Sequence, residues 1–296
     1  MKKILVTGTN SYIGKSLSSW LARYPDAYSV DTISLRDNAW KTRDFSKYDV
    51  IVHTVGIAHR KERKKNCKEY YKVNRDLSYQ IAKKAKEESV KQFVFISSMS
   101  VYGLECGTID RNTPLQPSGN YGKSKLQAEK LLLYLDEDSF KVVILRPPMI
   151  YGKGCKGNYP KLAKLATKTC IFPYINNQRS MLYIDNLTHY IQQIVDGKKR
   201  GIFMPQNTEY VNTSEMVQLI AQAHGKKIYL TKVFNPVLHF IKINTVKKLF
   251  GNLVYDKNIS DSNYNFYAFK ESILITEGGE KDEKSPLCSN RGKSPY

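Results

Sequence analysis

Short apolar runs alternate with amphipathic stretches along the first half of the chain. Runs rich in Val, Ile and Phe predict buried strands, and stretches whose apolar residues recur with a helical period predict helices. The expected strands are Ile4–Thr7, Ser29–Leu35, Val50–Thr54, Phe93–Ser97 and Lys141–Leu145. The expected helices are Ile13–Tyr24, Tyr70–Glu88 and Tyr121–Leu135. Continuous apolar strands separated by helices are typical of a parallel sheet covered on both faces, so we expect an α/β, doubly wound domain over residues 1–150.

The regularity weakens after Arg146–Gly152, where turn residues become common. The helices expected beyond this point are Tyr159–Thr167, Asp185–Asp196, Ser214–His224 and Val237–Leu249. Residues 151–276 are expected to form a smaller mixed α/β lobe over the sheet, with later segments able to return to the sheet domain. Residues 277–296 are rich in Gly, Lys, Ser and Pro, which predicts a disordered tail.

Length and composition place the chain among globular proteins. Its 296 residues, 41% of them hydrophobic, are enough for a sizeable core. No apolar run approaches the ~20 residues of a membrane span, and the stretch Ile4–Val6 is too short for a signal sequence. We therefore expect a cytoplasmic protein without membrane insertion. The five cysteines show neither C-x-x-C nor Cys/His ligand spacing, so we expect free thiols and no metal site.

The chain is strongly basic, with a formal net charge of +20. Such an excess suits nucleic acid, an acidic membrane surface or a polyanionic small molecule. The basic residues are spread out apart from one dense run, His59–Lys65, and no zinc-finger or RNA-binding aromatic signature is present. We expect no nucleic-acid partner. The charge is either a lysine-rich surface or an aid in attracting a diphosphate ligand.

A glycine-containing turn, Thr7-Gly-Thr-Asn-Ser-Tyr-Ile-Gly14, joins the first predicted strand to the first predicted helix. Gly8 permits a tight turn, Gly14 permits close packing of the helix on the strand, and the helix N-terminus offers N–H groups to a pyrophosphate. This context predicts a dinucleotide site. Ser11 departs from the pattern, because it stands where a glycine usually allows the closest backbone approach.

The end of the second predicted strand bears on the choice of cofactor. An acidic residue there favours NAD, whereas a nearby arginine accommodates the 2′-phosphate of NADP. The chain has Arg36 followed by Asp37, which leaves NAD and NADP both open. Arg36 is equally well interpreted as an ordinary surface charge.

Tyr121 and Lys125 are four residues apart at the start of a predicted helix. This spacing puts both side chains on one helix face, where a lysine charge can lower the pKa of a tyrosine. A phenol tuned in this way is a general acid/base for a hydroxyl or a carbonyl. Ser97 and Ser98 follow a buried strand at the end where such sheets bind ligands, and a hydroxyl there can hydrogen-bond a substrate oxygen beside Tyr121.

The order and spacing of these motifs resemble the extended branch of the short-chain dehydrogenase/reductase superfamily, and within it the nucleotide-sugar epimerase/dehydratase family that includes UDP-glucose 4-epimerases. The resemblance runs from Lys2 to about Glu277. The motifs are T-G-x-x-x-x-I-G at Thr7–Gly14, Asp44-Phe45, V-I-V-H-T-V-G at Val50–Gly56, V-N at Val73-Asn74, S-S-x-x-V-Y-G at Ser97–Gly103, Y-G-K-S-K at Tyr121–Lys125, L-R-P-P at Leu145–Pro148 and R-S-M-L-Y-I-D-N at Arg179–Asn186. The resemblance implies a Rossmann domain.

The resemblance also implies roles for the matching residues. Tyr121 would be the acid/base, Lys125 would lower its pKa and hold the nicotinamide ribose, and Ser98 would bind the reacting sugar oxygen. The other implied cofactor residues are Gly8, Ser11, Tyr12, Ile13 and Gly14 at the pyrophosphate, Asp44 and Phe45 at the adenine, Val55, Gly56 and Asn74 at the ribose and nicotinamide, and Pro148 near the nicotinamide ring. Asn158 and Arg179 would hold the nucleotide diphosphate, which suits the fixed fork of an arginine.

The chemistry that the resemblance implies is hydride transfer from C4 of a sugar, which gives a 4-keto intermediate. Dehydratases of the family carry Asp and Glu directly after the catalytic hydroxyl residue, but this chain has Met99 and Ser100, so we do not expect dehydration. Met149 and Arg36 lean toward an NADPH-dependent reductase of a UDP-4-keto-6-deoxy-hexosamine, whereas the breadth of the family favours a 4-epimerase. We place the epimerase first. A dinucleotide sensor without activity is a further alternative, which the triad Ser98, Tyr121 and Lys125 disfavours.

The expected partner is a nucleotide-diphosphate sugar, in particular a UDP-hexose or UDP-N-acetylhexosamine. The resemblance also implies a homodimer built on two helices of each subunit, for which Tyr70–Glu88 and Tyr121–Leu135 are the candidates. Synthesis of polysaccharide precursors is the expected setting.

Overall fold

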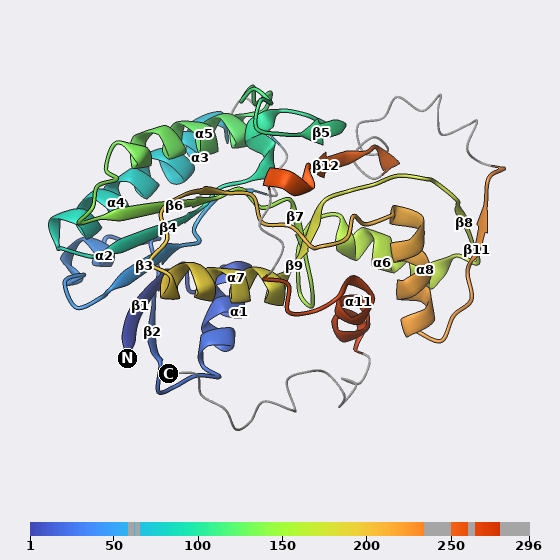
Figure 1. Ribbon diagram of the computed structural model, residues 1–296, viewed down its shortest axis with the longest axis horizontal. Coiled ribbons are helices and arrows are strands. Elements are labelled where there is room, and N and C mark those ends of the chain that lie inside the picture. Colours follow the sequence, from blue (N-terminus) through green and yellow to red (C-terminus); the bar gives the residue numbers. More distant parts are fainter. Residues whose placement is uncertain (59–61, 63–65, 234–249, 260–263, 279–296) are drawn as a thin grey trace.

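The computed structural model describes residues 1–58, 62, 66–233, 250–259 and 264–278. Its centre is a parallel sheet with the strand order β2-β1-β3-β4-β6-β10 (Figure 1). The bounds are β1 Lys2–Thr7, β2 Tyr28–Ile33, β3 Val50–His53, β4 Gln92–Ile96, β6 Lys141–Leu145 and β10 Gly201–Phe203. The order reverses between β1 and β3, which is where open parallel sheets bind their ligands. The predicted doubly wound sheet is confirmed.

Alternate residues of each central strand enter two separate apolar layers. Val50 and Val52 of β3 pack in one layer with Leu17 and Trp20 of α1 (Tyr12–Leu21), whereas Ile51 packs in the other. The first layer also contains α7 (Ile184–Asp196), and the second contains α4 (Ser78–Glu87) and α5 (Asn120–Leu133). Both faces of the sheet are therefore covered, which explains why its strands read as continuous apolar runs.

The helix predicted over Tyr70–Glu88 is continuous but not uniform. It begins as α3 (Cys67–Tyr71), continues as a π-helical segment η2 (Lys72–Leu77), and ends as α4. A wider π-helical turn shifts the register of the side chains that follow, and such turns often occur at functional sites. Asn74, which matters for the site below, lies in this segment.

The second half of the chain, together with β5 from the first half, forms short strand pairs, and further helices lie beside the sheet (Figure 1). The strand pairs are β7 (Met149–Tyr151) with β9 (Met181–Tyr183), β8 (Ile171–Pro173) with β11 (Tyr229–Thr231), and β5 (Gly107–Ile109) with β12 (Leu253–Tyr255). Within the described residues, the remaining helices are α2 (Ala39–Thr42), α6 (Tyr159–Lys168), α8 (Thr213–Ala223), α11 (Phe269–Glu277) and the 3-10 turns η3 (Met99–Tyr102) and η4 (Lys257–Ile259). The predicted helices at Tyr159–Thr167, Asp185–Asp196 and Ser214–His224 are confirmed as α6, α7 and α8.

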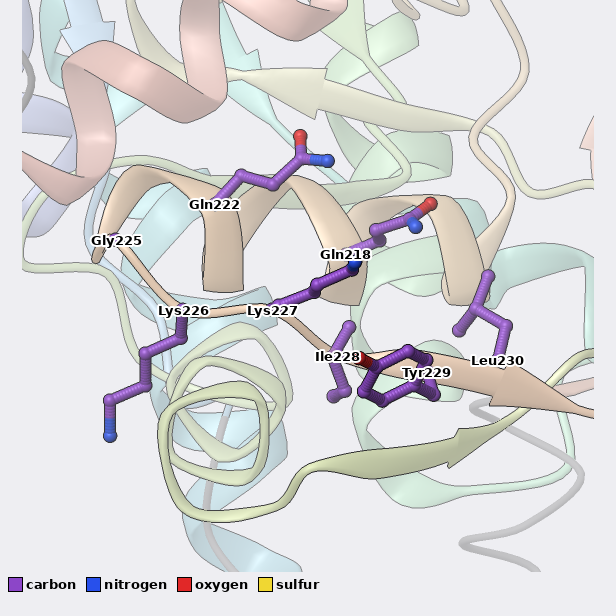
Figure 2. Close-up of a pocket in the computed structure, with 8 residues that line it drawn as sticks. All are labelled: Gln218, Gln222, Gly225, Lys226, Lys227, Ile228, Tyr229 and Leu230. Atoms are coloured by element: carbon purple, nitrogen blue, oxygen red, sulfur yellow. The ribbon is translucent and has the colours of Figure 1, made fainter.

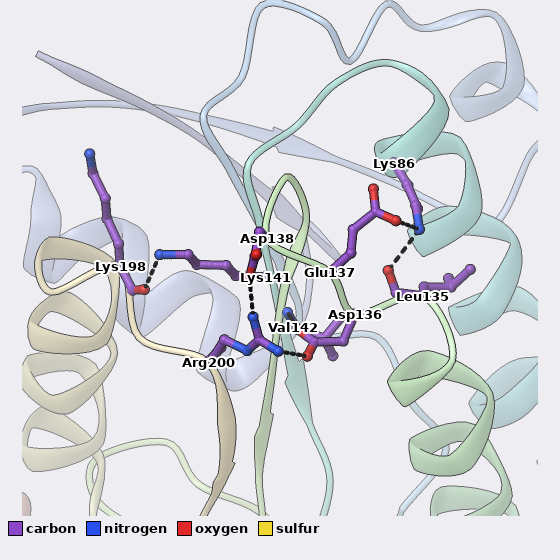
Figure 3. Close-up of polar contacts among 9 residues, drawn as sticks. All are labelled: Lys86, Leu135, Asp136, Glu137, Asp138, Lys141, Val142, Lys198 and Arg200. Carbon is purple, nitrogen blue, oxygen red and sulfur yellow. Dashed lines mark hydrogen bonds and ion pairs between the residues drawn. The ribbon is translucent and has the colours of Figure 1, made fainter.

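Two later elements, α7 and β10, belong to the sheet layer. Ion pairs anchor the segment before β10, because Arg200 contacts Asp136 at 3.1 Å and Asp138 at 2.8 Å (Figure 3). The acceptors lie in the loop after α5, which Lys86 of α4 also holds through the Leu135 carbonyl at 3.0 Å. The Arg200 side chain is half-exposed, so each ion pair contributes little on its own, but together the contacts fix one edge of the sheet.

Two predictions fall outside the described residues. The helix predicted at Val237–Leu249 is one, and the tail is the other, since the description ends at Gly278 just after α11. Within the described ranges, no helix combines the length and the apolar character that crossing a membrane requires.

Prediction: Gly103→Ala lowers the free energy of unfolding by roughly 3 kcal/mol or more, as overpacking adds to backbone strain. Gly103 follows η3 with φ +73°, and a Cβ there would lie 1.9 Å from the Gln116 carbonyl oxygen. Gly154→Ala is the matched control, because Gly154 has φ +79° but open space around it. Urea unfolding of both variants measures the difference, and equal losses would contradict the packing argument.

Candidate active site

The glycine turn packs tightly against the loop that follows β3. Gly8 has φ +96°, and a Cβ on it would lie 2.9 Å from Val55 Cγ2. A Cβ on Gly14 would lie 2.9 Å from Thr54 Oγ1, and that hydroxyl donates to the Thr7 carbonyl at 2.6 Å. Both glycines are therefore required for β1, α1 and the end of β3 to approach one another.

Ser11, which departs from the expected glycine pattern, is the N-cap of α1. Its Oγ accepts from the Gly14 N–H at 3.3 Å and donates to the Thr54 carbonyl at 3.3 Å. Serine is a preferred N-cap because its oxygen satisfies an N–H that the helix leaves unpaired. The hydroxyl thus braces the turn from within the protein.

Tyr12 and Ile13 begin α1 and pack against the core layer that contains α7. The Tyr12 hydroxyl is buried, and the structure gives it no hydrogen-bond partner within the described residues. Burial is the main cause that raises its pKa, followed by the nearby Cys155 and Asp185. A Cβ on Gly152 would lie 2.7 Å from this hydroxyl, so a glycine there leaves room for it.

Asn74 ties the loop after β3 to helix α5. Its side-chain oxygen accepts from the Ile57 N–H at 2.8 Å, and its nitrogen donates to the Ile57 carbonyl at 3.1 Å and to Ser124 Oγ at 3.0 Å. Gly56 lies in the same loop, and a Cβ on it would come within 3.1 Å of Lys125 Nζ and 3.2 Å of the Asn74 side-chain oxygen. Any larger residue at position 56 would crowd these two polar groups.

Lys125 is buried below this loop. Its ammonium donates to the Ile96 carbonyl at 2.8 Å and lies 4.5 Å from the centroid of the Phe95 ring. Burial lowers the pKa of Lys125 to about 7, and the charge of Glu129 opposes that shift. Glu129 itself pairs with Arg146 at 2.6 Å, so its carboxylate is already engaged by a cation.

Tyr121 lies one turn before Lys125 and next to Ser98. Burial raises the pKa of Tyr121, and a hydrogen bond with Ser98 opposes the rise. Gly122 explains this closeness, since a Cβ there would lie 2.5 Å from the Ser100 carbonyl oxygen and would push α5 away from η3. The structure thus brings Ser98, Tyr121 and Lys125 together, while the lowering of the Tyr121 pKa by Lys125 stays a prediction.

Glu62 is a functional candidate that the sequence analysis missed. Its carboxylate accepts from the Asn120 N–H at 2.9 Å and from the Tyr121 N–H at 3.0 Å. It therefore satisfies the open first turn of α5 and carries a negative charge where the helix dipole favours one. The only sequence signal is that Glu62 is the single acidic residue in the basic run His59–Lys65.

Arg36 and the implied adenine residues Asp44 and Phe45 follow β2 along the chain. Arg36 is exposed just beyond β2, and Asp44 is also exposed. Hydrogen bonds from the Ser46 hydroxyl and N–H hold the pKa of Asp44 below its usual range. The Phe45 ring is fully buried in the second core layer, and its N–H donates to Glu88 at 2.5 Å. The side chain of Phe45 therefore serves the core, and its role at the adenine stays a prediction.

The implied substrate residues lie toward the second half of the chain. Arg179 is half-buried and donates to the Gly251 carbonyl at 2.7 Å, and burial lowers its pKa. Asn158 precedes α6, and Pro148 is buried directly before β7. The segment at Arg179 is tied to β12, because Ser180 donates its N–H to the Leu253 carbonyl at 2.9 Å. Through the pairing of β12 with β5, this segment is linked to the loop that carries Ser98.

Residues 4–203 match the NAD dependent epimerase/dehydratase family, so the chain belongs to that family. This confirms the predicted resemblance and the class of cofactor. A UDP-glucose 4-epimerase of Vibrio cholerae is 31% identical over 291 residues, which cover 86% of this chain and 87% of that protein.

A second relative is more distant. It is an N-acetyl-α-D-glucosaminyl-diphospho-ditrans,octacis-undecaprenol 4-epimerase of Escherichia coli O157:H7, 27% identical over 212 residues, which cover 69% of this chain and 63% of that protein. Among solved structures, a UDP-glucuronic acid 4-epimerase of Bacillus cereus in complex with NAD has a TM-score of 0.71 at 20% identity, covering 93% of this chain and 97% of that one. The last likeness shows the shared fold.

Prediction: in the protein without cofactor, the free energy of unfolding rises with pH above about pH 7 relative to Lys125→Met. Folding lowers the pKa of Lys125 from 10.5 to about 7. Between these values the unfolded chain binds the proton and the folded chain does not, so stability gained from this group grows as the pH rises through that window and is lost as it falls. Denaturant unfolding at several pH values measures it.

Lys123→Met is the matched control, since Lys123 is exposed on the same helix. It should keep the pH dependence of the unaltered protein. A Lys125→Met variant whose stability follows the same pH curve as the unaltered protein would show that the ammonium is not desolvated in the fold.

Proposed function

We propose that this protein is a nucleotide-sugar 4-epimerase that acts on a UDP-hexose or UDP-N-acetylhexosamine through a 4-keto intermediate. The observation that carries the proposal is the hydrogen-bonded neighbourhood of Tyr121 and Ser98, with the buried Lys125 one helical turn away. Ser98 follows the carboxyl end of β4, and Tyr121 and Lys125 lie on α5, the helix between β4 and β6. The similarity to a UDP-glucose 4-epimerase of Vibrio cholerae supports epimerisation at C4.

The residues present fit a nicotinamide dinucleotide. Gly56 lets its loop approach Lys125 and Asn74 closely, and the structure gives the buried Tyr12 hydroxyl no hydrogen-bond partner within the described residues. Gly8, Ser11, Ile13 and Gly14 would shape the turn at the start of α1 that receives the pyrophosphate. The other proposed contacts are Tyr12, Arg36, Asp44, Phe45, Val55, Gly56, Asn74 and Pro148. When bound, the nicotinamide accepts hydride from the sugar C4 and returns it.

The catalytic residues would handle the proton. Ser98 holds the sugar oxygen, and Tyr121 takes the proton of the C4 hydroxyl as hydride leaves, then returns it when hydride is added to the opposite face. A charged Lys125 favours the phenolate of Tyr121 and donates to the ribose. Burial lowers the pKa of Lys125 to about 7, so the charged form is only weakly favoured in the protein without ligand. Ligand oxygens close to the ammonium would raise this pKa again and stabilise the charge. Asn158 and Arg179 would hold the diphosphate.

A reductase is the alternative reaction. Met149 follows Pro148 at the start of β7. Arg36 is exposed and has no ion pair within the described residues, so it would suit the 2′-phosphate of NADPH. Dehydration stays disfavoured, since Met99 and Ser100 carry no titrating group at the start of η3. The implied homodimer stays a prediction, supported by the exposed Leu133 and Tyr134 at the end of α5.

Prediction: Tyr121→Phe lowers kcat for interconversion of UDP-sugars at C4 by roughly a thousandfold or more, because the general acid/base is removed. Binding of NAD should survive. Tyr134→Phe is the matched control, since that tyrosine is 86% exposed at the end of the same helix. Activity retained by Tyr121→Phe would refute the assignment of the acid/base.

Prediction: protein purified without added nucleotide releases NAD upon acid denaturation, and that NAD supports turnover without net consumption. An epimerase regenerates its cofactor in each cycle, so tight retention is expected. Chromatography of the released nucleotide and absorbance of added NADPH give the two readouts. Stoichiometric oxidation of NADPH with a UDP-4-keto-hexosamine would favour the reductase instead.

A further inference from the structure

Two segments of the second half of the chain concentrate positive charge outside the proposed catalytic residues. Residues 159–176 and 218–233 contain six lysines and no Asp or Glu. The lysines are Lys161, Lys164, Lys168, Lys226, Lys227 and Lys232, and all are exposed. Figure 1 places the strands of these two segments, β8 and β11, at the end of the molecule away from the parallel sheet.

Apolar side chains stand among these lysines. β8 and β11 pair with Ile171 opposite Tyr229, and these two side chains are 54% and 58% exposed. Phe172 and Ile228, which alternate with them, are buried in the core. The small sheet therefore has an inner face that packs on the protein and an outer face on which two apolar side chains are exposed.

Several of these lysines lie next to one another and next to Tyr229. Two adjoining hollows of about 570 and 260 Å³ share Lys226 and Lys227 in their linings, and the larger one also includes Tyr229 (Figure 2). Lys227 Nζ lies 5.4 Å from the Tyr229 ring centroid. Lys226 is partly engaged, because it donates to the Thr167 carbonyl at 2.5 Å. We call the surface of Lys164, Lys168, Ile171, Lys227, Tyr229 and Lys232 the lysine face.

We infer that the lysine face docks this protein on an anionic lipid bilayer. Lysines near such a surface are each attracted by its negative potential, and their flexible stems let apolar neighbours sink while the ammonium groups stay at the phosphates. A tyrosine and an isoleucine among the lysines suit the boundary between headgroups and acyl chains. All the cations of this surface are lysines, whose compact ammonium groups act as point charges. Such groups suit a layer of many phosphates, whereas the planar guanidinium of arginine suits bidentate recognition of a single carboxylate or phosphate.

The inference goes beyond the proposed reaction and does not rest on it. Docking at a bilayer would apply to the epimerase and to the reductase alike, and none of the six residues belongs to the proposed catalytic or cofactor-binding set. A failure of docking would leave the reaction intact. A failure of the reaction would leave docking intact.

The test is co-flotation of the full chain with vesicles of equal parts phosphatidylglycerol and phosphatidylcholine, compared with vesicles of phosphatidylcholine alone. We expect binding to the anionic vesicles that falls as salt is raised, since exposed charges are screened. The double variant Lys227→Glu with Lys232→Glu should bind at least about tenfold more weakly. Its rate with a UDP-sugar in solution should be unchanged.

Two further variants keep the test sharp. Lys91→Glu with Lys198→Glu makes the same change of charge at exposed positions beyond the other end of the sheet, and should bind like the unaltered protein. Ile171→Ser with Tyr229→Ser should weaken the binding that persists at high salt. Equal loss in both charge variants, equal binding to both vesicles, or tighter binding to duplex DNA than to anionic vesicles would overturn the inference.

Discussion

The burial of one ammonium group sets the geometry of the whole candidate site. Lys125 reaches under the loop after β3 and donates to the Ile96 carbonyl, with the face of Phe95 beside it. A buried cation is costly unless polar groups surround it, so the fold must supply them at close range. The missing side chain at Gly56 lets the chain pass directly over the nitrogen. The loop, the strand end and the helix are fixed together by this single requirement.

A second buried charge connects the site to the rest of the protein. Glu129, one turn beyond Lys125, pairs with Arg146 and accepts from Ser97, and Arg146 also donates to the Tyr102 hydroxyl at 3.0 Å. Removing one partner of a buried pair leaves the other uncompensated, which makes such a pair a strong constraint on side-chain positions. It holds α5, η3 and the end of β6 in one arrangement, and Tyr255 of β12 joins them through the Arg146 carbonyl at 2.8 Å.

Much of this arrangement follows from local sequence. Apolar runs and helical periods identify the sheet and most helices, and the spacing of Tyr121 and Lys125 predicts their shared helix face. Contacts between distant segments are different, because no local pattern encodes them. The capping of α5 by Glu62, the engagement of Lys125 by Ile96 and the complete burial of the Phe45 ring all depend on how the elements pack. The periodicity of apolar residues likewise does not predict the π-helical segment that contains Asn74.

The cap formed by Ser11 has a consequence for molecular recognition. A turn whose shape is already fixed by its own hydroxyl loses little conformational freedom when an anion arrives, so association is entropically less unfavourable. The same bond occupies the Gly14 N–H, so the anion finds one donor fewer at the helix start. Selectivity for an anion at this turn must therefore come more from the fit of the anion to the preformed shape of the turn than from the number of backbone N–H groups available to bind it.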